Sequence, residues 1–339
     1  MADRVAVTLP VEDGLAAPDY VDLARLAERS GYDAVLAGEV AGPEVFSLLG
    51  MIAARTTSIR IGSGIVGCYA RPPVLTAMAF ATLASCAPGR VIAGIGSSTP
   101  VIVERWYGLP FRHPLGTVGE FIGILRQALS GEQVAATGKR LRSAGFRATM
   151  TAPAPVPVLL AAMNPGMLRL AGRLADGVFI TWTPPDEVAG RLAHVRDGER
   201  QAGRRPGQVW AAASFWAYCG PRQEEALERM RRVVLQYAMV PTHRSSFRRA
   251  FPALEEASAA WRRGDRKAAL RLVGDDTVRA LCAIGSAETV AGHIRALRSA
   301  GVALPIVLTP GATPGDLAGA QATITGLAQA LRLRGHVAS

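Results

Sequence analysis

The stretch 156–180, VPVLLAAMNPGMLRLAGRLADGVFI, places a turn between an apolar run and a helical pattern. The apolar run stops at Asn164-Pro165-Gly166. Proline is favoured at the first position of a helix, where its missing N–H costs nothing, and asparagine is favoured just before it. The free N–H groups at such a helix start bind anions, most often phosphate. The turn therefore predicts either a phosphate site or an ordinary capped turn.

Two glycine-rich stretches also follow apolar runs. In GIGSS, residues 94–98, two glycines and two serines are suited to a planar ring or a phosphate, although the GxG spacing alone is weak evidence. In GSGIVGCYARPP, residues 62–73, three glycines interrupt a strand pattern. They indicate a bulge, or a place where a ligand approaches the backbone closely.

Glu39 is an acid that follows a short apolar run, residues 34–37. In an apolar setting its carboxyl group is suited to binding a polar edge of a cofactor, or to proton transfer with a shifted pKa. The alternative is an ion pair with one of the many arginines.

Metal chemistry is not expected. The four cysteines and five histidines are scattered, with no CxxC pair and no HExxH spacing. Single reduced thiols in a reducing compartment explain the cysteines.

The formal net charge of +11 raises the question of nucleic-acid binding, which we do not expect. The arginines are spread over helical patterns, and the only dense patch is HRSSFRRAF at 243–251. Nucleic-acid binding usually shows a basic stripe with interleaved aromatics or a known module. A basic pocket for an anionic cofactor or substrate remains open.

Neither a membrane span nor a secretion signal is expected. No run of 18 uncharged apolar residues occurs, and the first residues, MADRVAVTLPVEDG, contain acids and no apolar block. We expect a cytosolic protein.

Short apolar runs alternate with helical patterns along the whole chain. Several runs show no polar alternation, which is typical of parallel strands buried on both faces. The eight expected strands are Val5–Leu9, Ala34–Ala37, Ile59–Val66, Val91–Gly96, Val156–Ala162, Gly177–Thr181, Val209–Tyr218 and Leu304–Leu308.

Eight such units predict an (α/β)8 TIM barrel, with a doubly wound sheet as the alternative. We expect one domain over 1–339, with insertions after strands 4 and 7 at about 99–152 and 222–284. The first should hold a helix near 117–129 and a hairpin, and the second should be helical. Because barrel active sites lie at the carboxyl ends of the strands, the turns described above should converge there.

Three stretches carry a resemblance to a known family. They are SIRIGSGIVGCYARPPVLTAMAFATLASCAPGRVIAGIGSSTPVIVERWYGLPF, GEFIGILRQALSGE and VPVLLAAMNPGMLRLAGRLADGVFITWTPP. They resemble the bacterial luciferase-like superfamily. Within it they are most similar to the coenzyme F420-dependent oxidoreductases, which include methylenetetrahydromethanopterin reductase and F420-dependent glucose-6-phosphate dehydrogenase.

The resemblance implies a deazaflavin, or alternatively FMN, at the carboxyl ends of the strands, and a homodimer. A bulge in the third strand, often with a non-prolyl cis peptide, would back the ring, and an acid would approach the ring edge. The implied cofactor-binding residues are Glu39, Ser63, Gly64, Ile65, Val66, Gly96, Ser97, Ser98, Met163, Asn164, Gly166 and Met167. Of these, Glu39 is also the candidate catalytic residue.

The sequence also departs from that family. The sugar-phosphate dehydrogenases carry a histidine after the acid and a glutamate after the glycine turn, where this chain has Val40 and Ser98-Thr99. Sugar-phosphate oxidation is therefore not expected, and no general base is evident. We expect a reductase that transfers hydride from reduced F420 to a small organic substrate.

Three aromatic residues, Tyr69, Trp182 and Trp216, are candidate walls of the substrate pocket or plain core residues. Two other functions remain open. One is a monooxygenase of the two-component type that uses reduced FMN, and the other is a non-catalytic flavin-binding protein.

Overall fold

The computed structural model describes residues 4–335 and contains a closed ring of parallel strands. Each strand of the ring pairs with the next, and the pairings of β9 with β10 and of β12 with β1 close it. In ring order the strands are β1 (Ala6–Thr8), β2 (Ala34–Ala37), β3 (Arg60–Ser63), β5 (Val91–Gly96), β8 (Val158–Ala161), β9 (Gly177–Thr181), β10 (Trp210–Tyr218) and β12 (Leu304–Leu308). The barrel prediction is confirmed, and the doubly wound alternative is wrong because no edge of this ring is left unpaired.

The third expected strand is interrupted, as its glycines indicated. β3 ends at Ser63, and the chain resumes as the short β4 (Val66–Gly67), which pairs with β5. The peptide bond between Gly64 and Ile65 is cis. A Cβ atom on Gly62 would lie 2.4 Å from the carbonyl oxygen of Ile92, so the backbones approach too closely there for any side chain.

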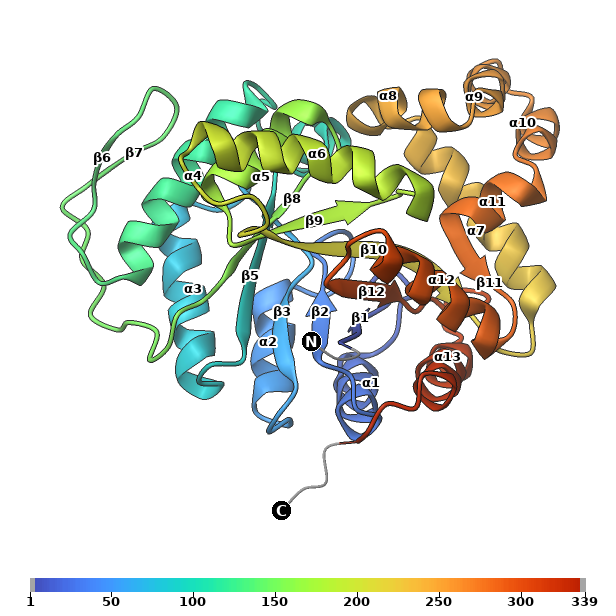
Figure 1. The fold of residues 1–339 in the computed structure, drawn as a ribbon, viewed down its shortest axis with the longest axis horizontal. Helices are drawn as coiled ribbons and strands as arrows, with labels where there is room; N and C mark the ends of the chain where they lie inside the picture. The colour runs from blue at the N-terminus through green and yellow to red at the C-terminus, as the bar shows by residue number, and fades with distance from the viewer. Residues whose placement is uncertain (1–3, 336–339) are drawn as a thin grey trace.

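Helices cover the outside of the barrel, because the strands alternate side chains between an inner and an outer apolar core (Figure 1). They are α1 (Ala17–Arg29), α2 (Val45–Ala53), α3 (Pro73–Cys86), α4 (Pro114–Leu129), α5 (Pro165–Leu174), α6 (Pro185–Gln201), α12 (Ala287–Ser299) and α13 (Leu317–Ala330).

The segment after β5 begins with a π-helical turn, η1 (Val101–Trp106), and continues into α4. It then forms the expected hairpin from β6 (Ala135–Thr137) and β7 (Arg142–Ala144). This hairpin and helices α8 to α10 lie at opposite sides of the barrel in Figure 1.

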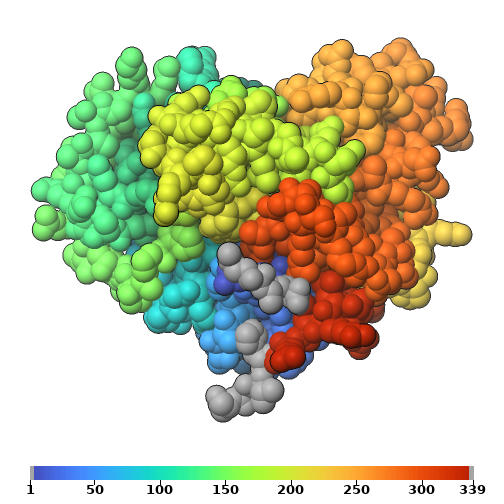
Figure 2. All heavy atoms as spheres, in the orientation of Figure 1, coloured from blue at the N-terminus to red at the C-terminus, as the bar shows by residue number. Residues whose placement is uncertain are grey.

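The segment between β10 and β12 is helical, as predicted, and forms a lobe with its own apolar cluster. Its elements are α7 (Gln223–Ala238), α8 (Pro241–Ala250), α9 (Ala253–Arg262), α10 (Arg266–Leu272), α11 (Asp275–Leu281) and β11 (Cys282–Ile284). The sequence analysis missed β11, a three-residue strand that pairs with β10 outside the ring. Figure 2 shows the lobe in orange beside α6, in yellow. Within 4–335, no helix has the length and apolar character needed to cross a membrane.

Candidate active site

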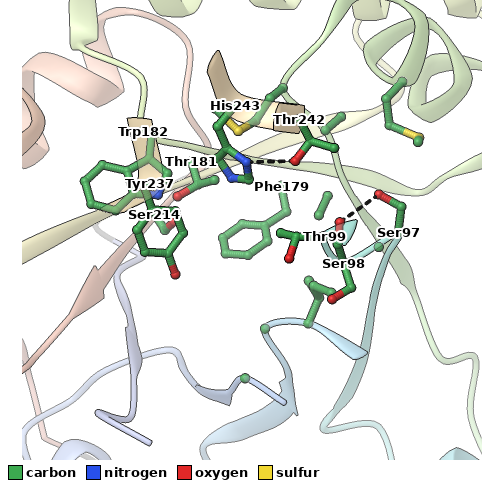
Figure 3. Close-up of a pocket in the computed structure, with 18 of the residues that line it drawn as sticks. Ser97, Ser98, Thr99, Phe179, Thr181, Trp182, Ser214, Tyr237, Thr242 and His243 are labelled. Atoms are coloured by element: carbon green, nitrogen blue, oxygen red, sulfur yellow. Dashed lines mark hydrogen bonds between the residues drawn. The ribbon is translucent and has the colours of Figure 1, made fainter. Parts of the chain in front are cut away.

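A cavity of about 460 Å³ lies where the carboxyl ends of the barrel strands meet the lobe (Figure 3). The turns after β2, β3, β5, β8 and β9 all contribute to its lining, so the predicted convergence of these turns is confirmed. Among the described residues, no group of three or more possible ligands could hold a metal ion.

Most of the predicted site residues line this cavity. They are Glu39, Gly64, Ile65, Gly96, Ser97, Ser98, Met163, Asn164, Gly166, Met167, Trp182 and Trp216.

Three predicted residues do not line it. Ser63 and Val66 are buried in the barrel wall, and the Ser63 hydroxyl donates to the Gly94 carbonyl at 2.7 Å. Tyr69 lies one layer behind the cavity, with its ring 5.1 Å from that of Phe111, which does line it. Ser63 and Val66 support the site instead of facing a ligand, because alternate side chains along a strand point to opposite faces.

The turn of residues 164–166 differs from the predicted cap. Asn164 occupies the N-cap position, but its side chain makes no cap hydrogen bond. Its Nδ2 donates to the Thr242 carbonyl at 2.9 Å, and its Oδ1 accepts from Ser245 at 3.1 Å. The N–H groups of Gly166 and Met167 therefore have no partner within residues 4–335, on a turn that faces the cavity.

A buried arginine supports this turn from behind. Arg191 of α6 donates through Nη1 to the Met163 carbonyl at 2.7 Å and through Nη2 to Glu187 at 3.2 Å. Burial lowers the pKa of Arg191, and the neighbouring Glu187 opposes that shift. The guanidinium thus holds the turn in shape and adds positive charge to the amino end of α5.

Glu39 lies at the cavity and also forms the ion pair that was considered as its alternative role. It lines the cavity, and its carboxylate pairs with Arg71, whose Nε lies 3.2 Å from both carboxylate oxygens. Arg71 also pairs with Glu44, whose carboxylate caps the start of α2. The hydrogen bond with Glu39 raises the pKa of Arg71. The Glu39 side chain is only 13% exposed, so this pair is largely removed from water.

Two of the lining residues have a positive φ angle without being glycine. Ser98, after β5, has φ 61°, and Trp182, after β9, has φ 51°. Such backbone is uncommon for non-glycine residues and concentrates at functional sites.

Trp182 and Trp216 belong to an aromatic wall. Trp182 stacks on Trp216 at 5.8 Å between ring centroids, and lies 4.7 Å from Tyr237 and 5.7 Å from Phe247. Both predicted roles, pocket wall and core, therefore apply to these two tryptophans.

The sequence analysis missed the contribution of the lobe. Tyr237 from α7, and Thr242 and His243 from α8, line the cavity opposite the serine turn (Figure 3). The Thr242 hydroxyl lies 3.0 Å from Nδ1 of His243. Burial lowers the pKa of His243 to about 4. The signal available in the sequence was the basic patch at 243–251, which begins at His243.

Residues 6–304 match the family model described as luciferase-like monooxygenase. The chain belongs to this family. The match spans the barrel from β1 to the start of β12, including all the turns that line the cavity.

Two relatives of this luciferase-like chain are 5,10-methylenetetrahydromethanopterin reductases. It is 26% identical to the 5,10-methylenetetrahydromethanopterin reductase of Archaeoglobus fulgidus over 294 residues, which cover 84% of this chain and 88% of the relative. It is 32% identical to the same-named enzyme of Methanolobus tindarius over 191 residues, but that match spans only 56% of this chain and 58% of the relative.

A solved structure shares the fold over almost its whole length. The F420-dependent tetrahydromethanopterin reductase of Methanopyrus kandleri superposes with a TM-score of 0.83, at 23% identity, over 96% of this chain and 98% of that one. This luciferase-like enzyme is thus related, at low identity, to F420-dependent oxidoreductases.

Proposed function

We propose that this luciferase-like protein is a coenzyme F420-dependent oxidoreductase, and that it acts as a reductase on a small organic substrate. The observation that carries the proposal is the pair of unpartnered N–H groups at Gly166 and Met167, at the start of a ten-residue helix and beside a buried arginine. Such a helix start favours a phosphate group. The F420 dependence of the Methanopyrus kandleri reductase, which shares this fold, supports the same cofactor.

The residues present fit such a cofactor. Gly64 and Ile65 offer a flat surface of backbone for a ring, and the turn at 96–98 offers two serine hydroxyls. Thr8 also lines the cavity, and its buried Oγ1 has no hydrogen-bond partner among the described residues. A polar atom left unpaired in this way costs free energy unless a ligand satisfies it.

In this proposal the chain binds and orients, because the cofactor, when bound, supplies the hydride. Gly166 and Met167 hold its phosphate, Ile65 supports the ring, and Glu39 accepts a hydrogen bond at the ring edge. Trp182 and Trp216 exclude water from the opposite side. An FMN-dependent monooxygenase and a non-catalytic flavin-binding protein are the competing functions.

Titration of the purified protein tests the cofactor. We expect F420 to quench the fluorescence of the protein at a lower concentration than FMN does. FMN binding that is as tight or tighter would overturn the F420 assignment. Turnover of reduced F420 with an organic acceptor, without oxygen uptake, would separate the reductase from the monooxygenase and from the non-catalytic protein.

We also propose that two copies of the chain associate, as the resemblance to F420-dependent oxidoreductases implies. Sedimentation velocity at micromolar concentration should give a species of twice the chain mass. A single species of one chain mass would contradict this.

A further inference from the structure

The cavity is almost free of charged side chains, although the whole chain carries a formal net charge of +11. Among the described residues that line it, Glu39 is the only one with a side chain charged at neutral pH, and its carboxylate is already paired with Arg71. An anionic ligand group would therefore meet no side-chain counterion here. Burying such an unpaired ion is costly, so the cavity discriminates against charged substrates.

The unpartnered N–H groups described above lie at one end of the site. They belong to Gly166 and Met167, and the proposed cofactor uses both. The other end is formed by Trp182, Trp216 and Tyr237, an aromatic wall on the lobe side whose rings are apolar apart from the Tyr237 hydroxyl and the indole N–H groups. A second ligand has this wall as its main contact surface.

His243, on the lobe side, is placed to hydrogen-bond such a ligand. The His243 ring lines the cavity, and its Nδ1 lies 3.0 Å from the Thr242 hydroxyl. Its other nitrogen, Nε2, has no hydrogen-bond partner among the described residues. Figure 3 shows the imidazole extending toward the cavity from α8, above Phe179.

The position of His243 is coupled to the cofactor turn. The Thr242 carbonyl accepts a hydrogen bond from Nδ2 of Asn164 at 2.9 Å, and Asn164 is the residue before the start of α5. The imidazole also packs against Tyr237, with 5.6 Å between the ring centroids. The turn and the aromatic wall together hold the ring in one orientation, as a specificity-determining residue requires.

The imidazole stays neutral under ordinary conditions, because burial lowers the pKa of His243 to about 4. A neutral imidazole offers one N–H donor and one acceptor. With the Thr242 hydroxyl at Nδ1, either tautomer leaves Nε2 able to bind an uncharged oxygen, as a donor to a carbonyl or as an acceptor from a hydroxyl. It supplies no charge to attract a carboxylate or phosphate.

We infer that the substrate of this cavity is an uncharged, largely apolar molecule with one carbonyl or hydroxyl oxygen, and that this oxygen binds Nε2 of His243. The inference rests on the proposed function in one respect: a reductase would convert the carbonyl group of such a substrate into the hydroxyl group of the product. Its physical basis, an uncharged aromatic site with one free imidazole nitrogen, does not depend on which cofactor binds.

Calorimetric titration with matched ligands tests the charge selectivity. A set of aromatic methyl ketones is used, each paired with its carboxylate analogue, as in 4-acetylbenzamide and 4-acetylbenzoate. The holoprotein and the cofactor-free protein are both titrated at pH 7.5. We expect at least tenfold tighter binding of the uncharged member. If no uncharged ketone binds more tightly than its paired carboxylate, the inference is overturned.

Variants test the role of His243. His243→Phe keeps a ring but removes the hydrogen bond, and should weaken ketone binding at least tenfold. His243→Gln keeps a neutral donor and acceptor, and should recover most of that loss. His194→Phe, at a half-buried position of α6 that contacts Arg169 of α5 and lies outside the cavity lining, is the matched control and should leave ketone binding unchanged. Melting curves verify that each variant folds.

The outcomes separate this inference from the proposed function. F420 affinity should stay within twofold of the parent in both His243 variants. If His243→Phe binds ketones as the parent does, the oxygen binds elsewhere and the inference is wrong. If both variants lose F420 affinity to the same degree as ketone affinity, α8 serves only to support the cofactor turn, which also overturns it. Failure of F420 to bind the parent protein would overturn the proposed function, while the ketone titration of the cofactor-free protein still decides the inference.

Discussion

At the scale of single residues, the proposed cofactor site offers backbone N–H groups for an anion and mostly uncharged side chains around them. Glu39, the only charged side chain among the described residues of the lining, is held by Arg71, which also binds Glu44 at the start of α2. The unpartnered N–H groups of Gly166 and Met167 supply the positive potential instead. Substitutions at these residues therefore separate ligand binding from folding.

Glu39→Gln should reduce turnover strongly while it changes the free energy of unfolding by only about 1 kcal/mol. The loss in stability is small because glutamine keeps the shape of the side chain and a carbonyl oxygen that can accept from Arg71, and because Arg71 keeps its ion pair with Glu44. Steady-state kinetics and chemical denaturation measure the two effects. Unchanged turnover would mean that Glu39 is only an ion-pair partner.

Gly166→Asp should weaken binding of the intact cofactor at least tenfold, about 1.4 kcal/mol, because a carboxylate at the start of α5 repels a phosphate. A Cβ atom on Gly166 would lie 3.1 Å from the end of the Leu115 side chain, which can move. Gly166→Asn has the same shape without the charge, so it is the matched control and should retain more affinity. Binding of a cofactor fragment without phosphate should change little. If the intact cofactor binds Gly166→Asp normally, the phosphate lies elsewhere.

Because of His293 in α12, we expect the free energy of unfolding to decrease at acidic pH. Its Nε2 is buried without a partner, its ring packs 4.3 Å from Phe215, and burial lowers its pKa to about 4 from 6.5. The unfolded chain binds this proton more readily, so the stability contributed by the neutral ring is complete above about pH 6.5. It decreases as the pH falls toward 4, by a total on the order of 3 kcal/mol.

His293→Leu removes this term. The variant should lie within about 1 kcal/mol of the parent at pH 7.5 and gain about 2 kcal/mol relative to it at pH 5. Urea denaturation at the two pH values measures the difference. An equal effect of the substitution at both values would show that His293 does not titrate in this range.

At the scale of elements, helix packing positions the proposed phosphate site. α5 begins at the site, and its position depends on close contact with α6. A Cβ atom on Gly172 would lie 2.1 Å from the Val195 carbonyl oxygen, and one on Gly198 would lie 2.0 Å from the Arg169 carbonyl oxygen. Only glycine permits the two backbones to approach this closely.

Gly172→Ala should therefore destabilise the protein by about 1–3 kcal/mol and weaken cofactor binding, because α5 must move away from α6. Gly190→Ala, at an α6 position where a Cβ atom meets nothing within 4 Å, is the control. It should stabilise by about 0.5–1 kcal/mol because it removes a glycine from a helix interior. Chemical denaturation with and without cofactor measures both. Equal stability of the two variants would show that the helices tolerate the shift.

At the scale of the whole molecule, the positively charged side chains lie outside the lining of the cavity. The chain has a formal net charge of +11, and its positive charge resides on side chains outside the cavity lining, because Glu39 is the only charged side chain among the described residues of that lining. The surface can thus attract an anionic cofactor at long range, while the substrate end remains neutral.

The affinity of the protein for F420 should therefore decrease as salt is added, because salt screens the attraction between the positive surface and the anionic tail of this cofactor. Raising the ionic strength from about 0.01 M to 1 M shortens the screening length from about 30 Å to about 3 Å. A deazaflavin without phosphate or tail is the control, and its affinity should remain nearly constant. Equal salt dependence of the two would show that surface charge does not assist binding.

The elements of the barrel were predictable because their signals are local. Continuous apolar runs predicted all eight ring strands, and four of them match in both bounds: Ala34–Ala37, Val91–Gly96, Gly177–Thr181 and Leu304–Leu308. The glycines at 62–67 predicted the interruption of the third strand, since backbone that approaches a neighbour within van der Waals distance excludes a Cβ atom. Once a barrel is expected, the turns at its carboxyl ends are expected to converge.

The tertiary structure alone decided the partners of these residues. Asn164 was expected to cap α5, but Thr242 and Ser245 lie close enough to bind its side chain, so the helix start stays free. His243 and Tyr237 come from a lobe whose packing depends on contacts between residues far apart in the chain. Residue type and spacing encode local conformation and burial, whereas the choice among many possible hydrogen-bond and ion-pair partners depends on which surfaces the folded chain brings together.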